Sequence, residues 1–353
     1  MNLAAVDKIA KAVLYEGYML YPYRPSSVKN QQRWNFGVLC PQSYSEAQKG
    51  GEAWTMQTEC LVEGSRLSGL EVRVRFLQLV ARTVGEPILP VEKLPPEVAP
   101  EFRFVERLAV NGRAYQPWQE AIERDLCLPV FSIEALSHGA ICEEFHFPVE
   151  KQFEYLLEDA GKIVGVIVRE RRAVRGAIEV MAEPAAEGVF KISVLIRNAT
   201  PYEACDSGRD AALLSSMASV HTVLGVQDGK FISLIAPPGH LSDAAGHCVN
   251  VGTWPVLVGQ EGQCDTILSS PIILYDYPQI APESAGDLFD GTEIDEILSL
   301  RIMTLTDDEK REMSQSDERA RQVLERTESM PVEQFMKLHG VLRGLHPLKE
   351  ESE

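Results

Sequence analysis

The chain has 353 residues and a formal net charge of −18 at pH 7. Single hydrophobic cores stop growing at roughly 250–300 residues, so the length predicts more than one domain. The acidic balance argues against a protein that grips a nucleic-acid backbone, because such proteins need a concentrated cationic surface.

The sequence carries no readable targeting signal. Near the N-terminus, Asp7, Lys8 and Lys11 interrupt the apolar residues before a signal-peptide core forms. No run approaches the roughly 18 apolar residues that span a bilayer. Seven cysteines lie scattered without a CxxC pair, and their odd number fits reduced thiols better than a disulfide framework. These features predict a soluble, cytoplasmic protein without a membrane span.

The N-terminal part of the chain predicts one helix and several strands. Apolar residues at helical spacing favour a short helix at about 3–15. Alternating apolar and polar residues predict half-buried antiparallel strands at 54–63 and 72–76. Five prolines between residues 85 and 100 indicate an extended surface connection.

Two further local signals follow this connection. Asn111 and Gly112 have the favoured composition of a two-residue type I′ turn, which predicts a hairpin at about 104–116. Pro117 stands at a plausible first-turn position, which favours a helix at 117–126.

The middle of the chain is richer in strand patterns. Runs with period-2 alternation and one further strand lie at residues 164–168, 178–180, 190–196 and 230–236. The first three are too closely spaced for crossover helices, so we expect antiparallel pairing. A helix is expected at 209–220, where His221 would stabilise the C-terminal end as a cation, with catalysis as its alternative role. Residues 236–280 predict loops and short strands.

The pattern changes to helix near the C-terminus. Thr292 precedes an amphipathic helix expected at 292–303. Thr306 and Glu309 have the capping-box spacing that begins a second, highly charged helix. Pro331 begins a third.

Together these patterns predict an α+β fold that is mainly antiparallel β-sheet of the sandwich or barrel kind. We expect two packed regions, an α+β region at 1–130 and a β-rich region at 131–285. A helical C-terminal segment at 286–353 completes the predicted chain.

Cysteine and histidine residues supply the candidate metal site. The candidate ligands of zinc or nickel are Cys142, His146, His240, His247 and Cys248. On a strand, Cys142 and His146 would point to the same face. The two groups lie about a hundred residues apart, without the spacing of a zinc finger. A buried thiol and satisfied histidines explain the same residues without a cofactor.

Other readable catalytic motifs are missing from the sequence. It contains no GxGxxG, no GxxxxGK followed by Ser or Thr, no GxSxG and no HExxH. Their absence excludes only the enzyme classes that carry these motifs.

Aromatic and basic side chains crowd residues 15–34. The candidate partner-binding residues are Tyr21, Tyr23, Arg24, Lys29, Arg33 and Trp34. Pro22 and Pro25 restrict the backbone between them. Arginine recognises carboxylates and tyrosine supplies rigid contact area, which is typical of interface anchors. In the alternative interpretation, the aromatic rings cover a sheet edge while the cations pair with nearby acids.

Several long segments carry a family resemblance, among them YPYRPSSVKNQQRWNFG, WTMQTECLVEG, HTVLGVQDGKFISLIAPP and SSPIILYDYPQIAPESAGDLFDGTEIDEILSLRIMTLTDDEK. They resemble an uncharacterised bacterial protein family whose genes are associated with NiFe-hydrogenase operons of the high-affinity, aerobic type. The resemblance implies an accessory or assembly protein that binds a hydrogenase subunit or maturation intermediate, without catalysis of its own. A metal- or thiol-dependent enzyme using the Cys/His cluster and a structural subunit of a larger complex are the alternative functions.

Overall fold

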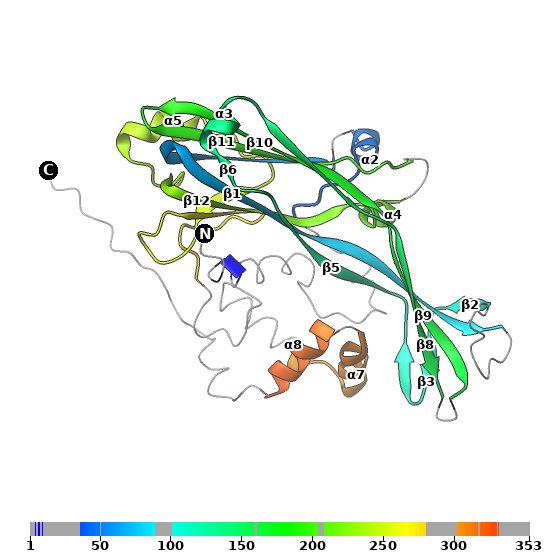
Figure 1. The fold of residues 1–353 in the computed structure, drawn as a ribbon. Coiled ribbons are helices and arrows are strands. Elements are labelled where there is room, and N and C mark those ends of the chain that lie inside the picture. Colours follow the sequence, from blue (N-terminus) through cyan, green and yellow to red (C-terminus); the bar gives the residue numbers. More distant parts are fainter. Residues whose placement is uncertain are drawn as a thin grey trace.

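The computed structural model describes residues 4, 6, 7, 9, 36–49, 51–88, 101–158, 161–203, 208–279, 302–316, 318–329 and 331. The protein is mostly antiparallel β-sheet with few helices (Figure 1), which confirms the predicted α+β, mainly β class.

The strands are β1 (Thr55–Pro87), β2 (Phe102–Val105), β3 (Leu108–Val110), β4 (Arg113–Tyr115), β5 (Trp118–Cys127), β6 (Phe131–Ser132), β7 (Ile141–Phe147), β8 (Glu150–Leu157), β9 (Ile163–Arg171), β10 (Val174–Ala186), β11 (Val189–Asn198), β12 (Met217–Ile232), β13 (Trp254–Leu257) and β14 (Thr266–Ser270). The helices are α2 (Gln42–Ala47), α3 (Ile133–Ser137), α4 (Arg209–Leu213), α5 (Ser242–Gly246), α7 (Asp307–Ser316) and α8 (Glu318–Ser329), with a 3₁₀ turn η2 (Gly239–Leu241).

β1 organises the 12-stranded sheet. It pairs antiparallel with β2, β5, β6, β9, β11 and β12. The sequence predicted two separate strands at 54–63 and 72–76, but both belong to β1, which continues through an irregular stretch between Gly64 and Gly69. Both runs pair with β12, on either side of this irregular stretch, so one long strand carries them.

The main hydrophobic core lies on the face toward which alternate residues of β1, β10 and β11 point. It joins residues from these strands, including Val72, Val74, Phe76, Ile178, Val180, Ile192, Val194 and Ile196. The ring of Phe76 lies 6.0 Å from that of Phe145 and 5.9 Å from that of Phe147, between ring centres. The sheet therefore curls until β1 and β7 share one core.

The opposite face of β1 is buried as well. Leu77 and Leu79 pack with Ala212 and Leu213 of α4 and with Cys40. β1 is therefore buried on both faces just beyond the predicted half-buried strand at 72–76, within which Arg73 remains partly exposed. Coverage by α4 and by the segment before α2 is the physical reason, and it is a tertiary feature that alternation does not report.

One sheet crosses the predicted boundary between 1–130 and 131–285. β1 pairs with β2 and β5 from the first range and with β9, β11 and β12 from the second. The two ranges thus share a backbone hydrogen-bond network and a core. Figure 1 shows α3 and α5 near one end of this sheet and β2, β3 and β8 near the other.

Two predicted helices are wrong. Residues 117–126 form most of β5, which pairs with Arg73–Arg82 of β1, so ladder hydrogen bonds outweigh the helical preference of this segment. The helix expected at 209–220 ends at Leu213, because β12 begins at Met217 and pairs with β1.

Local signals were predicted more accurately. Asn111 and Gly112 both have positive φ, 50° and 77°, and join β3 to β4 as a type I′ turn requires. Thr306 N–H donates to Glu309 Oε2 at 2.5 Å, and Glu309 N–H lies 3.4 Å from Thr306 Oγ1, so the predicted capping box begins α7. The expected strands at 164–168, 178–180 and 190–196 are parts of β9, β10 and β11.

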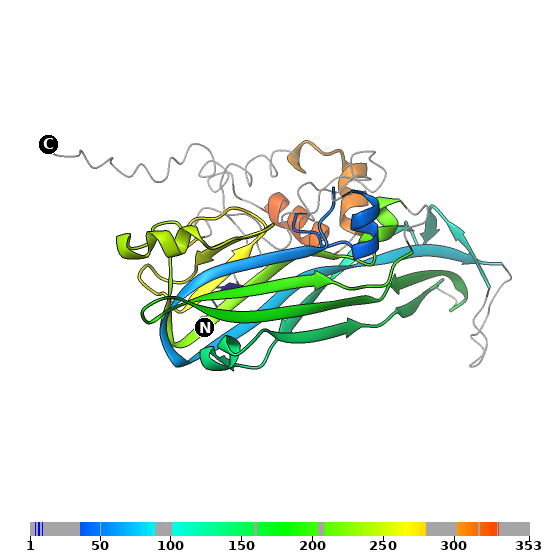
Figure 2. The ribbon, with the colours of Figure 1, turned by 90° about the horizontal axis from the view of Figure 1, so that it is seen from above.

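Other predictions fall partly or wholly outside the described residues. They are the helix at 3–15, of which Ala4, Val6, Asp7 and Ile9 are described as helical, most of the connection at 85–100, most of the helix at 292–303 and the helix beginning at Pro331. α7 and α8 lie beside each other on one side of the sheet (Figure 2). Within the described ranges, no helix has the length and apolar character needed to cross a membrane.

The shared core gives a stability prediction. Phe76→Ala should lower the free energy of unfolding by about 3–5 kcal/mol, because it removes a fully buried ring and leaves a cavity. Phe104→Ala on β2 is the control, since that ring is 58% exposed, and it should change the value by less than about 1 kcal/mol. Urea denaturation measures both. Equal losses for the two variants would show that the core does not depend on Phe76.

Candidate functional site

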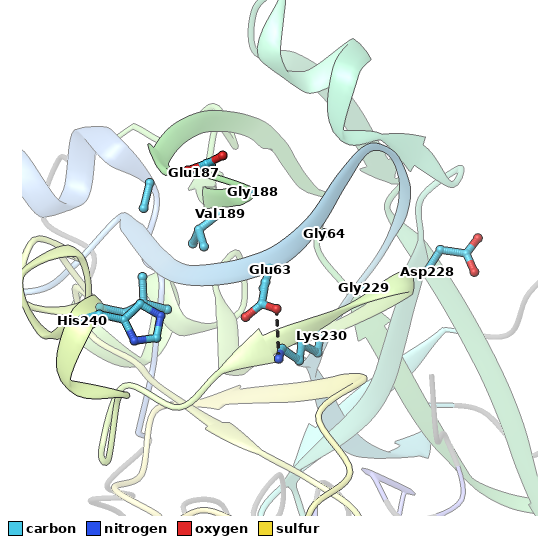
Figure 3. Close-up of a pocket in the computed structure, with 11 residues that line it drawn as sticks. Glu63, Gly64, Glu187, Gly188, Val189, Asp228, Gly229, Lys230 and His240 are labelled. Atoms are coloured by element: carbon cyan, nitrogen blue, oxygen red, sulfur yellow. Dashed lines mark ion pairs between the residues drawn. The ribbon is translucent and has the colours of Figure 1, made fainter.

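An open pocket of about 850 Å³ lies among the turns at one end of the sheet (Figure 3). It is lined by Glu63, Gly64, Ala186, Glu187, Gly188, Val189, Asp228, Gly229, Lys230, His240 and Leu241. Glu63 and Lys230 point toward each other, with His240 and Asp228 on opposite sides. The pocket therefore offers charged groups of both signs.

Backbone geometry brings these turns together. Asp228 has a φ of 54°, a left-handed conformation that few residues with a side chain adopt. A Cβ on Gly229 would lie 3.0 Å from the carbonyl oxygen of Glu63, so the close approach of β12 to β1 favours glycine here.

The charged side chains that line the pocket are exposed to solvent. The Nζ of Lys230 lies 3.0 Å from Oε1 of Glu63, and about half of each side chain is exposed. Ion pairs this exposed contribute roughly 0–1 kcal/mol. Water also screens the charge of a ligand in this pocket, so these side chains bind a charged ligand only weakly.

A buried carboxylate lies four residues before Glu63 on β1, at Glu59. Its Oε2 accepts a hydrogen bond from the N–H of Val249 at 2.7 Å, and its Oε1 accepts one from Ser193 Oγ at 3.0 Å. The Nζ of Lys191 lies 3.7 Å from Oε1, and the N–H of Glu59 donates to Asn250 Oδ1 at 2.8 Å. Glu59 thus fastens the 249–250 segment to the sheet.

The five candidate metal ligands lie in three places. Cys142 and His146 are on the exposed face of β7, as expected for residues four apart on a strand. His240 lines the pocket, and His247 and Cys248 follow α5. Within the described part of the chain, no group of three or more His, Cys, Asp or Glu side chains is placed to hold a metal ion. The five residues therefore do not form such a group.

His247 and Cys248 have local partners. The Nδ1 of His247 lies 2.6 Å from the carbonyl oxygen of Asp243, and Cys248 Sγ lies 3.7 Å from that of Ala244. Burial, and then the charge of Glu59, raise the pKa of the Cys248 thiol to about 11. Since the thiolate is the reactive form, Cys248 is a poor nucleophile near neutral pH.

The sequence predicted that His221 would stabilise the end of a helix, but in the structure it does not. It lies fully buried on β12, because α4 ends eight residues earlier and the chain has already joined the sheet. Its Nδ1 lies 2.7 Å from the carbonyl oxygen of Ser219 and so donates to it, which leaves Nε2 to accept from Ser270 Oγ at 3.4 Å. Both His221 and Ser270 are fully buried, so this pair is a structural contact within the sheet.

Large apolar side chains gather at one rim of the sheet. We call this surface the apolar rim, and its residues are Phe36, Trp254, Ile273 and Tyr275, which are 40%, 43%, 70% and 82% exposed.

Pro271 joins the two parts of the apolar rim. A Cβ on Gly37 would lie 2.5 Å from the Cβ of Pro271, so the backbone after Phe36 packs directly on this proline. Trp254 pairs with Ser270, the residue before Pro271. Ile273 and Tyr275 follow within four residues. The backbone thus brings these exposed residues close to Pro271 from two distant parts of the sequence.

The sequence reasoning missed the apolar rim. WPVLV and PIILY were visible as short apolar runs, but their composition does not say which side chains face solvent. The six predicted partner-binding residues between Tyr21 and Trp34 lie outside the described residues. Comparison with protein-family models and with curated proteins found no match to this chain.

The buried histidine gives a pH prediction. Burial is the main cause that lowers the pKa of His221 from its ordinary value of 6.5 to about 4, and the nearby charge of Arg75 acts in the same direction. As the pH falls below 6.5, His221 becomes protonated in the unfolded chain but stays neutral in the folded chain. The free energy of unfolding therefore decreases until about pH 4. The contribution of His221 should fall by about 2 kcal/mol between pH 7 and pH 5.

Denaturation curves of the wild type and of His221→Gln measure this contribution. Other groups titrate in both proteins, so the difference between the two pH profiles isolates His221. Parallel profiles would contradict the prediction.

Proposed function

We propose that this protein binds a partner polypeptide through the apolar rim, and that the partner is a NiFe-hydrogenase subunit or a maturation intermediate of one. The observation that carries the proposal is the exposure of Phe36, Trp254, Ile273 and Tyr275, whose backbone segments meet near Pro271. Single exposed apolar side chains are ordinary, but a group of large ones that includes Trp and Tyr is typical of interface anchors.

The backbone beneath the apolar rim is firmly held, which supports a binding role. The N–H of Leu39 donates to the carbonyl of Met217 at 2.8 Å, and the reverse bond is 3.1 Å. The buried amide of Asn198 donates to the carbonyls of Leu39 and Ser215 at 2.8 and 3.1 Å. A surface fixed before binding loses little conformational entropy when a partner docks.

Chain continuity extends the proposed contact. The predicted partner-binding residues end at Trp34, two residues before Phe36. We therefore include Tyr21, Tyr23, Arg24, Lys29 and Arg33 in the proposed interface, as residues of the stretch that leads into the apolar rim. Arginine and tyrosine would add hydrogen bonds to carboxylates and carbonyls of the partner.

The sequence resemblance supports the choice of partner, since it links the family to hydrogenase operons. The raised pKa of Cys248 favours binding over the thiol-dependent alternative, because this thiol stays protonated near neutral pH.

Affinity capture from the native host tests the proposal. Tagged wild-type protein should recover a hydrogenase subunit or maturation intermediate, identified by mass spectrometry. The double variant Trp254→Ser, Tyr275→Ser should recover at least about tenfold less, because two anchor residues are lost. A deletion strain should lose hydrogenase activity, and the double variant should fail to restore it.

Leu67→Ser is the matched control, because Leu67 is 79% exposed on the bend of β1 and lies outside the apolar rim. It should recover the partner like the wild type. Unchanged hydrogenase activity in the deletion strain, with no hydrogenase component captured, would sink the proposed partner. Equal recovery by the double variant and the control would sink the proposed surface.

A further inference from the structure

Arg124 on β5 is a half-buried guanidinium at the end of the main core. Its Nε and Nη2 donate to Oε1 of Gln78 at 2.9 and 2.7 Å, and its Cζ lies 4.3 Å from the centre of the Phe147 ring. Gln78 is itself fully buried, and its Nε2 donates to the carbonyl of Arg172 at 2.8 Å. A buried amide and an aromatic face therefore fix the orientation of this guanidinium.

Positive charge around Arg124 exceeds the negative charge that balances it. Arg171 has only 12% of its side chain exposed and forms an ion pair with Glu150. No ion pair joins Arg124 to a carboxylate of the described residues, and its guanidinium donates to Gln78. Desolvation, and then the charge of Arg171, lower the pKa of Arg124. Arg171 thus has a carboxylate partner in Glu150, whereas the partly buried guanidinium of Arg124 is held by an amide and a ring, an arrangement that costs free energy.

Neighbouring arginines on the sheet show how the fold balances such charges elsewhere. Arg82 lies 3.1 Å from a carboxylate oxygen of Glu120, and Arg169 lies 2.8 Å from Glu120 and 2.7 Å from Glu154. Each of these guanidiniums has at least one carboxylate in contact. Arg124 has an amide and a ring in place of an acid.

We propose that Arg124, with Arg171 close by, binds an oxyanion, the phosphate or carboxylate group of a ligand. The Nη1 of Arg124 makes no hydrogen bond to a described residue, so its two N–H donors remain for the anion. The planar fork of arginine matches a two-oxygen acceptor, and Gln78 holds the fork in place before the ligand arrives. This site is separate from the apolar rim and does not depend on the proposed hydrogenase partner.

Thermal unfolding of the full-length protein tests the site, with inorganic phosphate as the probe at constant ionic strength. Phosphate should raise the Tm of the wild type to a plateau, because it binds the folded state. Arg124→Met should weaken the apparent phosphate affinity at least about tenfold, since a charge-assisted, two-point contact is lost. Its side chain still covers Phe147, so the variant should fold.

Arg113→Met is the matched control, because Arg113 also stacks on a ring, that of Tyr115 at 5.1 Å, but is exposed. It should respond to phosphate like the wild type. Arg124→Lys keeps the charge without the fork and should also bind phosphate more weakly, and it carries the test if Arg124→Met does not fold.

A second series with acetate at the same ionic strength distinguishes the two sources of the oxyanion. A Tm rise with phosphate alone assigns a phosphate ligand, and a comparable rise with acetate assigns a carboxylate. Equal responses of the wild type and the Arg124 variants, or no response to either anion, would overturn the proposal.

Discussion

Backbone hydrogen bonding along β1 is the constraint on which the rest of the structure depends. A strand of 33 residues presents N–H and C=O groups to both sides, and such groups cost free energy when buried without partners. Six strands, drawn from residues between 102 and 232, meet this demand. The chain on both sides of residue 130 therefore assembles on β1, and one sheet crosses the predicted boundary there.

Side-chain alternation along β1 determines which of its residues join the core and which polar residues follow them on the same face. Phe76, Gln78 and Arg82 share one face, because side chains two residues apart on a strand point the same way. Phe76 lies in the aromatic core, Gln78 is a buried amide, and Arg82 pairs with Glu120. The face thus changes from apolar to charged within six residues, and Arg124 lies at this transition because β5 pairs in register with β1 there.

Features set by neighbouring residues were predictable from the sequence. The Asn111–Gly112 turn, the capping box of Thr306 and Glu309, and the closely spaced strands β9 to β11 depend on local backbone preferences and on alternation. These signals need no knowledge of the tertiary fold.

Features set by distant partners were not predictable in this way. β5 contains good helix formers such as Ala121 and Glu123, but pairing with β1 makes it a strand. The burial of His221 follows from the early end of α4. The apolar rim depends on the packing of Gly37 on Pro271, residues 234 positions apart, and no local pattern reports such a contact.

Glu59 and Arg124 show how structural and functional charges can be told apart. Glu59 is a buried carboxylate with a cation nearby and hydrogen bonds to both oxygens, so its environment is complete without a ligand. Hydrogen bonds to Gln78 fix the orientation of Arg124 as well, but no carboxylate of the described residues forms an ion pair with it. A fold that needed only to close its core at this position would gain more from an uncharged side chain over Phe147.

The net charge of −18 decides how an anion could reach Arg124. The acidic surface repels anions at long range, but salt screens that repulsion over about 8 Å at physiological ionic strength. The local field of Arg124 and Arg171 then dominates, because the core side of the site is dry and screens less. Selection at this site therefore rests on short contacts and on the fixed fork, so a ligand is recognised by the shape of its oxyanion rather than by its total charge.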